Sequence, residues 1–249
     1  MSAPRATPAL VAFAVGLVGY SLYLFTLNAF SSMKDTRTPF LVNVAENVTN
    51  PLMGEIRFAW WREGLEALAA GEAARSHPVM KALQPAVASG RLPAALLGSM
   101  IEARHSDLEP APFADEPGLV AYIDGTAGAL MAAAAHLLDP ASAPEATQDA
   151  ARAWAWSGLY RAGEALAARG RRWTPATWSD ASDGEIAAHV AHRVEAAVKT
   201  GNAALKALPL AAFPAAAYAT LARPLLRHGN LTELGKRVRL VASVARGRI

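Results

Sequence analysis

One stretch of the chain, residues 150–175, constrains the fold more than any other. It is rich in alanine, the strongest helix former, and its first proline is its last residue, Pro175. Gly170 precedes that proline, in the order in which helices commonly end. Five residues fall at helical spacing and so share one face: Trp154, Gly158, Arg161, Ala162 and Ala165. Because small side chains let neighbours approach closely, the stretch predicts a long helix in the middle of a bundle.

The composition of the whole chain points the same way. Hydrophobic residues make up 53% of the 249 positions, and much of that share is alanine. Sustained period-two alternation of β-branched residues, which would indicate strands, is not found. The chain has no cysteine, which excludes disulfides, thiolate nucleophiles and cysteine-bound metal clusters. We therefore expect an all-α protein with one substantial core and room for a small appendage.

The charge pattern narrows the class of partner. The net charge is only +3, which suits an anionic membrane surface or an acidic partner as well as nucleic acid. Basic and aromatic residues do not interleave as they would in a nucleic-acid interface, so no nucleic-acid partner is expected. Residues 231–249 place five basic side chains among apolar ones: Lys236, Arg237, Arg239, Arg246 and Arg248. This tail predicts a basic amphipathic helix, either resting on anionic lipid headgroups or exposing a solvated face.

The N-terminal region has a different character. Residues 8–30 are strongly apolar, and no charge lies between Arg5 and Lys34. About 20 such residues cross a bilayer core as a helix. A membrane-embedded helix is the leading interpretation, with a buried helix of a soluble bundle and a cleaved signal peptide as alternatives. Lys34 and Arg37 outnumber Arg5 on the other side, so the positive-inside bias predicts a membrane-associated protein whose bulk is cytoplasmic.

Several residues on two predicted helices carry a family resemblance. They are Glu55 to Glu63, with Trp60 and Trp61, and then Ala153, Trp154, Arg161, Gly170, Arg171 and Pro175. On these residues the chain from about Pro51 to its C-terminus resembles the squalene/phytoene synthase family. The resemblance implies an all-α, isoprenoid synthase-type helical bundle, preceded here by an N-terminal hydrophobic helix or helical hairpin.

The same resemblance draws attention to two positions. In active family members the central helix carries two aspartates four residues apart, and here Ala162 and Leu166 stand at those positions. Two carboxylates one turn apart can hold Mg²⁺, which takes up the charge of a leaving diphosphate. Alanine and leucine offer no oxygen. We therefore expect no metal site and no cofactor, with Mg²⁺ required only if the chain is an active enzyme after all.

The first 50 residues resemble a different family. Residues 33–40, with Asp35, Thr36, Arg37, Thr38 and Pro39, resemble an inter-helix turn of the lipid II flippase family, and the likeness extends over about residues 9–50. It covers too little of a flippase to carry that activity over. We expect two parts, a membrane-type segment at 1–50 and a synthase-like domain at 51–249. A true fusion, a gene rearrangement and a mistaken gene model all stay open.

Five residues are candidates for binding a diphosphate or an isoprenoid: Arg57, Arg62, Tyr122, Arg161 and Arg171. Arg57 and Arg62 follow the synthase-like start of their helix, and Arg161 and Arg171 match the central motif. A structural role competes for the first two, in which the arginines pair with carboxylates, for example Arg62 with Glu66 one turn away.

These observations support three functional hypotheses. The leading one is a catalytically degenerate synthase-like protein that binds an isoprenoid or a protein partner at a membrane. Silent relatives act in respiratory complex I assembly, so the resemblance also implies an assembly-factor role. The alternative is an active, Mg²⁺-dependent head-to-head prenyltransferase making a squalene- or phytoene-like product, which needs carboxylates such as Glu55, Glu63 or Glu164 to converge. The third is a flippase fragment with a functional membrane segment only.

Overall fold

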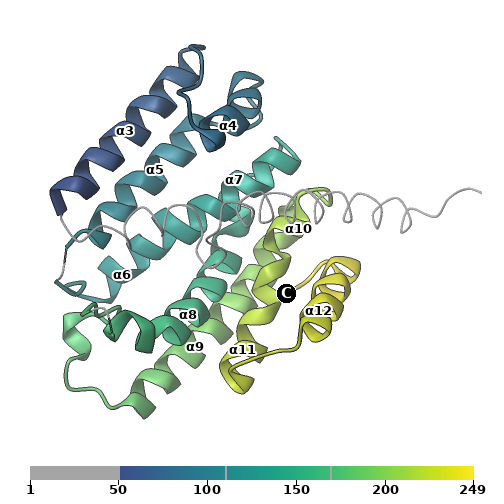
Figure 1. The fold of residues 1–249 in the computed structure, drawn as a ribbon. Helices are drawn as coiled ribbons and strands as arrows, with labels where there is room; N and C mark the ends of the chain where they lie inside the picture. The colour runs from purple at the N-terminus through teal and green to yellow at the C-terminus, as the bar shows by residue number, and fades with distance from the viewer. Residues whose placement is uncertain (1–50, 110, 169) are drawn as a thin grey trace, which may run out of the picture.

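The computed structural model describes residues 51–109, 111–168 and 170–249, and these residues contain helices and turns but no strands (Figure 1). The predicted all-α class is therefore confirmed. The predicted membrane helix and the flippase-like turn lie outside the described residues.

The described helices follow one another with short connections. In chain order they are α3 (Pro51–Ala69), α4 (Pro78–Ala88), α5 (Ala94–Arg104), the 3₁₀ turn η1 (His105–Asp107), α6 (Glu116–Ile123), the π-helical turn η2 (Asp124–Gly128), α7 (Ala129–Leu138), α8 (Glu145–Ala167), η3 (Ala176–Trp178), α9 (Asp183–Ala204), η4 (Leu205–Ala207), α10 (Phe213–Ala216), η5 (Ala217–Leu221), α11 (Ala222–His228) and α12 (Glu233–Arg246). Side-chain caps fix several starts: Ser182 and Glu185 form a reciprocal capping box at α9, and Asp115 caps α6.

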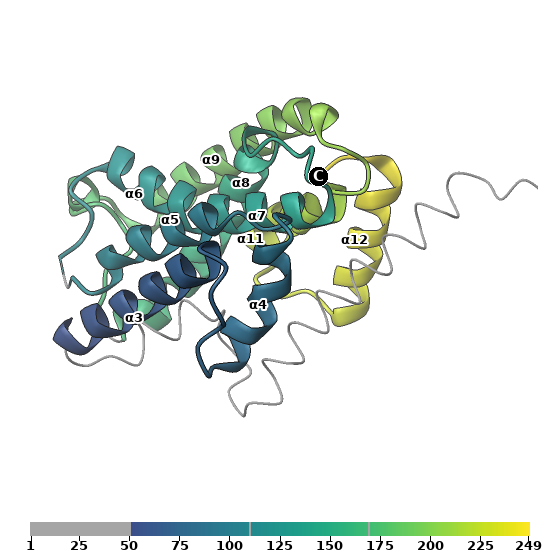
Figure 2. The same ribbon diagram turned by 90° about the horizontal axis from the view of Figure 1, so that it is seen from above.

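The helices form a bundle with three regions. Helices α3, α4 and α5 lie together at one end, the long helices α8 and α9 run side by side, and α10 to α12 pack at the C-terminal side (Figures 1 and 2). The run from α6 through η2 to α7 passes between the first two regions, with α5 on one side and α8 on the other. This run, Glu116–Leu138, is long and apolar enough to cross a membrane by length and composition alone, and 44% of its most apolar window is buried in the bundle.

Three apolar clusters hold these regions together. Phe58, Trp61 and Met80 anchor the cluster between α3, α4 and α5. A second cluster joins α6, α8 and α9, and a third joins α7, α8 and α10. Since α8 contributes to two of the three, it is central to the bundle, as the sequence predicts.

The central helix differs from its prediction in one respect. It ends where expected: Gly170 adopts a φ of 71°, a left-handed conformation that favours glycine. Its buried face, however, runs through Ala146, Ala150, Ala153 and Ser157, whereas Gly158, Arg161 and Ala165 are exposed. The expectation that small residues of the face carrying Gly158 and Ala165 pack between helices is therefore wrong. The described neighbours of α8 cover its other side.

Candidate functional site

A buried carboxylate organises the junction between α5, α6 and the segment after α8. The side chain of Asp107 is only 7% exposed. Its Oδ2 accepts a hydrogen bond from Arg104 Nη1 at 2.8 Å. Its Oδ1 accepts from the Tyr122 hydroxyl at 3.0 Å and from Arg171 Nη2 at 2.8 Å. We call Arg104, Asp107, Tyr122 and Arg171 the Asp107 cluster.

Local structure brings these four side chains together. Arg104 ends α5, and Asp107 ends the 3₁₀ turn that follows it. Tyr122 lies near the end of α6, and its hydroxyl also accepts from Arg104 Nη1 at 2.8 Å. Arg171 comes next to Gly170, whose positive φ reverses the chain so that the Arg171 amide donates to the Leu166 carbonyl at 3.0 Å. The turn after α8 therefore places Arg171 against Asp107.

The protonation state of Tyr122 follows from this environment. Burial raises the pKa of Tyr122 well above its ordinary value of 10.0 because the phenolate is poorly solvated there. The nearby Arg104 opposes this rise in pKa, and Asp107 adds to it. The hydroxyl is therefore neutral and donates to Asp107. Arg171 is the more exposed of the two arginines on Asp107: its side chain is 28% exposed, against 16% for that of Arg104.

An aspartate just after a helix commonly bonds its own local backbone, but Asp107 has more distant partners. Its carboxylate bonds three side chains, including that of Arg171, 64 positions away. A buried ion needs several partners to offset its lost hydration, and residues from three elements supply them here. The cluster works first as a brace that holds the turn after α8 onto the end of α5.

A second ionic bridge joins η2 to α8. Arg152 donates two hydrogen bonds to Asp124, from Nε at 2.8 Å and from Nη2 at 2.7 Å, and one from Nη1 to Asp149 at 3.0 Å. The hydrogen bond with Asp124 raises the pKa of Arg152 above its ordinary range. π-helical turns such as η2 often mark functional positions, but here both carboxylates are held by one arginine. Only Asp149 and Arg152, three residues apart on α8, were a recognisable pair in the sequence.

The five predicted binding residues do not gather at one point. Tyr122 and Arg171 meet in the Asp107 cluster. Arg57 on α3 and Arg161 on α8 are exposed, with no bonded side-chain partner among the residues that the structure describes. Arg62 is half-buried and does not join the Asp107 cluster; its ionic partner is Glu102. A shared role for all five in substrate binding stays a prediction.

Arg62 shows why the local pairing rule failed on α3. Its Nε lies 3.5 Å from Glu102 Oε1, on α5, and not beside Glu66. Because α5 packs directly on α3, Glu102 reaches Arg62 across the helix interface, whereas Glu66 is exposed. The structural alternative for Arg62, pairing with a carboxylate, is therefore confirmed with a different partner.

The positions expected to carry acids are apolar and partly covered. Ala162 and Leu166 are both half-buried, and Leu166 packs against the cluster of α6, α8 and α9. One turn earlier, a Cβ placed on Gly158 would meet nothing within 4 Å. One residue on, a Cβ on Gly163 would lie 2.7 Å from Trp173 Nε1. Gly158 thus faces open space, whereas Trp173 fills the space beside Gly163.

The three carboxylates that an active enzyme would need do not share a partner. Glu63 pairs with Arg75 at 2.7 Å, Glu55 lies 3.2 Å from His105 Nε2, and Glu164 is exposed on α8. Within the described ranges, no three His, Cys, Asp or Glu side chains come together as a metal-binding group.

With this geometry in place, comparison with known proteins identifies the class. A family model described as squalene/phytoene synthase matches residues 40–240, and the chain belongs to this family. The fold also resembles the crystal structure of squalene synthase HpnC from Alicyclobacillus acidocaldarius, with a TM-score of 0.58 and 20% sequence identity. That match covers 83% of this chain and 79% of the other, and at this identity it shows the fold. No curated protein sequence matches the chain. The predicted family is confirmed, while the flippase-like segment is not shown by either comparison.

Proposed function

We propose that the chain is a catalytically degenerate squalene/phytoene synthase-like protein that binds an isoprenoid diphosphate without ionising it. The observation that carries this proposal is the pair Ala162 and Leu166, which stands where active relatives of this family carry two aspartates. Neither side chain can ligate a cation, and the described acids near α8 are exposed or held by arginine.

The rate enhancement that a bound divalent cation supplies is large enough for its loss to abolish useful activity. A bound divalent cation contributes several kcal/mol to stabilising charge on a leaving phosphate oxygen. Each ~1.4 kcal/mol changes a rate about tenfold, so losing ~4 kcal/mol slows ionisation about a thousandfold. A bundle that retains its arginines but not its acids can therefore hold a diphosphate far better than it can cleave one.

Retained binding is supported by the arginines around the open side of α8. Arg161 is exposed, with no described partner to occupy its guanidinium group, and Arg171 is partly exposed beside Asp107. Guanidinium groups bind phosphate oxygens through paired donors. Arg57, Arg62 and Tyr122 are secondary candidates for the same ligand.

The test compares binding and turnover in one preparation of the full chain. Farnesyl diphosphate is titrated by calorimetry, and diphosphate release is followed in the presence of Mg²⁺. We expect saturable binding and no diphosphate release above buffer. Replacing Arg161→Gln should weaken binding about tenfold, whereas Arg172→Gln, which removes the same charge from another exposed arginine, should not. Steady diphosphate release would end the proposal, and a coupled C30 product beside it would establish the prenyltransferase alternative.

The proposal includes a place in the cell. The apolar segment at residues 8–30 and the basic tail support a membrane-associated protein with its bulk in the cytoplasm, where it meets membrane lipid and a protein partner in an assembly-type role. Cell fractionation tests this directly: recovery of the full chain in the soluble fraction at low salt contradicts it.

A further inference from the structure

Helix α12 has two apolar faces, and only one of them is covered by the bundle. Leu240 and Val244, four residues apart, pack against the core cluster of α7, α8 and α10. A second stripe points away from that core: Leu234 is 72% exposed, Val238 58% and Val241 52%. Spacings of four and three residues place these three side chains on one face. We call them the outer stripe of α12.

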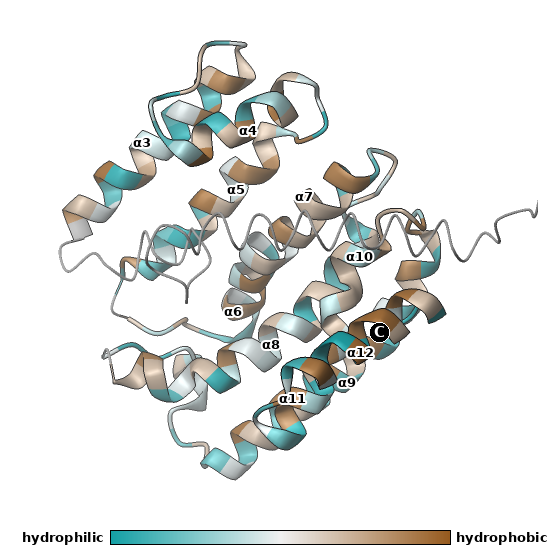
Figure 3. Ribbon diagram, turned by 45° about the vertical axis from the view of Figure 1, so that its right-hand side comes forward, coloured by the Kyte–Doolittle hydropathy of each residue, from teal (hydrophilic) through white to brown (hydrophobic). Residues whose placement is uncertain are grey.

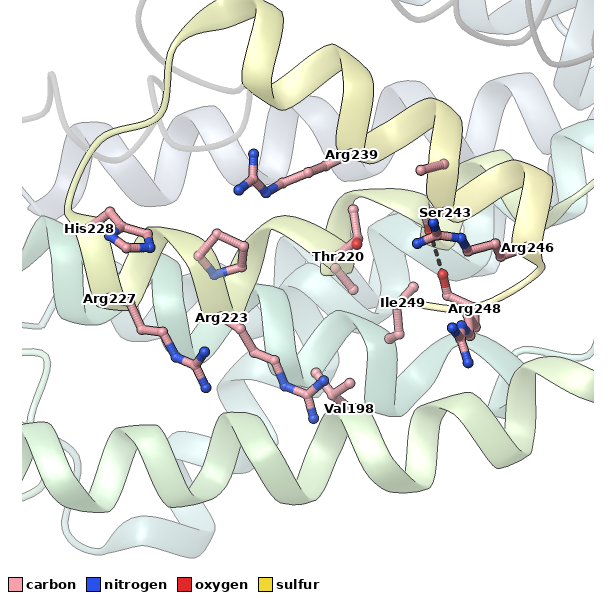
Figure 4. A pocket seen from close by; sticks show the side chains of 13 residues that line it. Val198, Thr220, Arg223, Arg227, His228, Arg239, Ser243, Arg246, Arg248 and Ile249 are labelled. Atoms are coloured by element: carbon pink, nitrogen blue, oxygen red, sulfur yellow. Dashed lines mark hydrogen bonds between the residues drawn. The ribbon is translucent and has the colours of Figure 1, made fainter.

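A basic groove lies beside this stripe, between α11 and α12. It has a volume of about 380 Å³. Its basic lining residues come from both helices and the C-terminal turn: Arg223, Arg227, His228, Arg239, Arg246 and Arg248. Figure 4 shows Arg239 and Arg246 on α12, with Arg223, Arg227 and His228 on α11. Figure 3 shows polar and apolar residues alternating around α12.

The positive charge of this groove is only partly neutralised. Glu195 on α9 pairs with both Arg223 and Arg227. Among the described residues, the Arg239 side chain donates to a single acceptor, the Gly235 carbonyl of its own helix. The guanidinium groups of Arg246 and Arg248 have no hydrogen-bonded or ionic partner among the described residues. Three arginines are therefore available to an outside anion.

The charges of α12 indicate what kind of partner covers the outer stripe. The helix has four basic residues and one acidic residue, and that acid, Glu233, already bonds Lys236 at 2.7 Å. Arg237 flanks the outer stripe on one side, and Arg239 and Arg246 flank it on the other. A second copy of this chain would bring the same charges face to face, which is unfavourable. An anionic bilayer complements both features, hydrocarbon for the stripe and phosphate for the arginines.

From this arrangement we infer that α12 is the membrane-docking surface of the protein. The outer stripe enters the acyl boundary of an anionic bilayer, and the arginines of the groove bind the phosphate groups of its lipids. The inference deepens the membrane association included in the proposed function. It does not depend on isoprenoid binding, so either claim can fail while the other stands.

The chain has no cysteine, so a single introduced thiol reports on one position. Val238→Cys is labelled with an environment-sensitive dye in the full chain and mixed with phosphatidylcholine vesicles, with or without phosphatidylglycerol. We expect a blue shift only with phosphatidylglycerol, weakening as salt rises. Leu210→Cys, 66% exposed outside α12, is the matched control and should not shift. Because the dye reads α12 itself, attachment of another segment to the vesicle cannot produce the signal.

A second comparison tests the arginines. Adding Arg239→Gln and Arg246→Gln to the labelled chain should weaken the vesicle titration about 25-fold, at roughly fivefold for each cation near an anionic surface. Lys81→Gln with Arg172→Gln removes two exposed charges elsewhere and should have no such effect. Equal blue shifts at residues 210 and 238, or none at 238, would overturn the inference. A shift at 238 that grows with protein concentration without vesicles would assign the stripe to self-association instead.

Discussion

If the Asp107 cluster is a structural brace, replacing its carboxylate should cost much of the stability of the fold. Asp107→Ala removes an acceptor of three hydrogen bonds and leaves Arg104 and Arg171 without their shared counter-ion. Removing one partner of a buried ion pair costs about 3–5 kcal/mol. The side chains of Arg104 and Arg171 are 16% and 28% exposed, so water recovers part of this. We therefore expect a loss of about 2–4 kcal/mol.

Circular dichroism measures this loss in two ways, as a lower free energy of unfolding in urea and as a lower Tm on heating. For a domain of this size each kcal/mol shifts Tm by about 2–4 °C, so Asp107→Ala should lower Tm by roughly 5–15 °C. Tyr122→Phe removes one hydrogen bond to Asp107 and one from Arg104, and should cost only about 1–2 kcal/mol. Glu72→Ala removes an exposed acid and should stay within about 0.5 kcal/mol of the parent. If Asp107→Ala is as mild as Glu72→Ala, the cluster is not a brace, and its arginines are free for another task.

Three further predictions concern other parts of the chain. Gly170→Ala should cost about 1–2 kcal/mol in urea unfolding because alanine is strained at its φ of 71°. Ser182→Ala breaks the α9 capping box and should cost about 1 kcal/mol near pH 7. The hydrogen bond from Ser182 lowers the pKa of Glu185 below its ordinary 4.5, so the contribution of that bond to stability is full above pH 4.5 and is lost as pH falls through the lowered pKa. The gap in stability between the parent and Ser182→Ala should therefore narrow in acid without closing, because only the parent keeps the bond from the Glu185 amide to Ser182 Oγ. Ala162→Asp with Leu166→Asp should create calorimetrically detectable Mg²⁺ binding, and equal heats from the parent chain would contradict the assignment of the lost metal site.

The parts of the fold that the sequence predicts are those fixed by near neighbours. The end of α8 at Gly170 and the cap at Ser182 depend on residues within one turn, so composition and spacing identify them. The partner of Arg62 is different, because Glu102 arrives from another helix and displaces the local choice. The hub role of Asp107 was equally out of reach, since one of its partners lies 64 positions along the chain. Ionic contacts between distant residues depend on how the helices pack against one another, and residue spacing within one helix does not reveal this.

Helix α12 shows the same limit from the other direction. The sequence correctly indicates a basic helix with apolar residues, but a single amphipathic face would need only one neighbour. In the structure Leu240 faces the core while Val238 faces solvent, with Arg239 between the two faces. A helix with two apolar faces separated by arginines leaves one of them in water unless a second surface covers it, and contiguous exposed apolar side chains mark interaction sites. The bundle covers one, and a surface that is both apolar and anionic is the neighbour that suits the other.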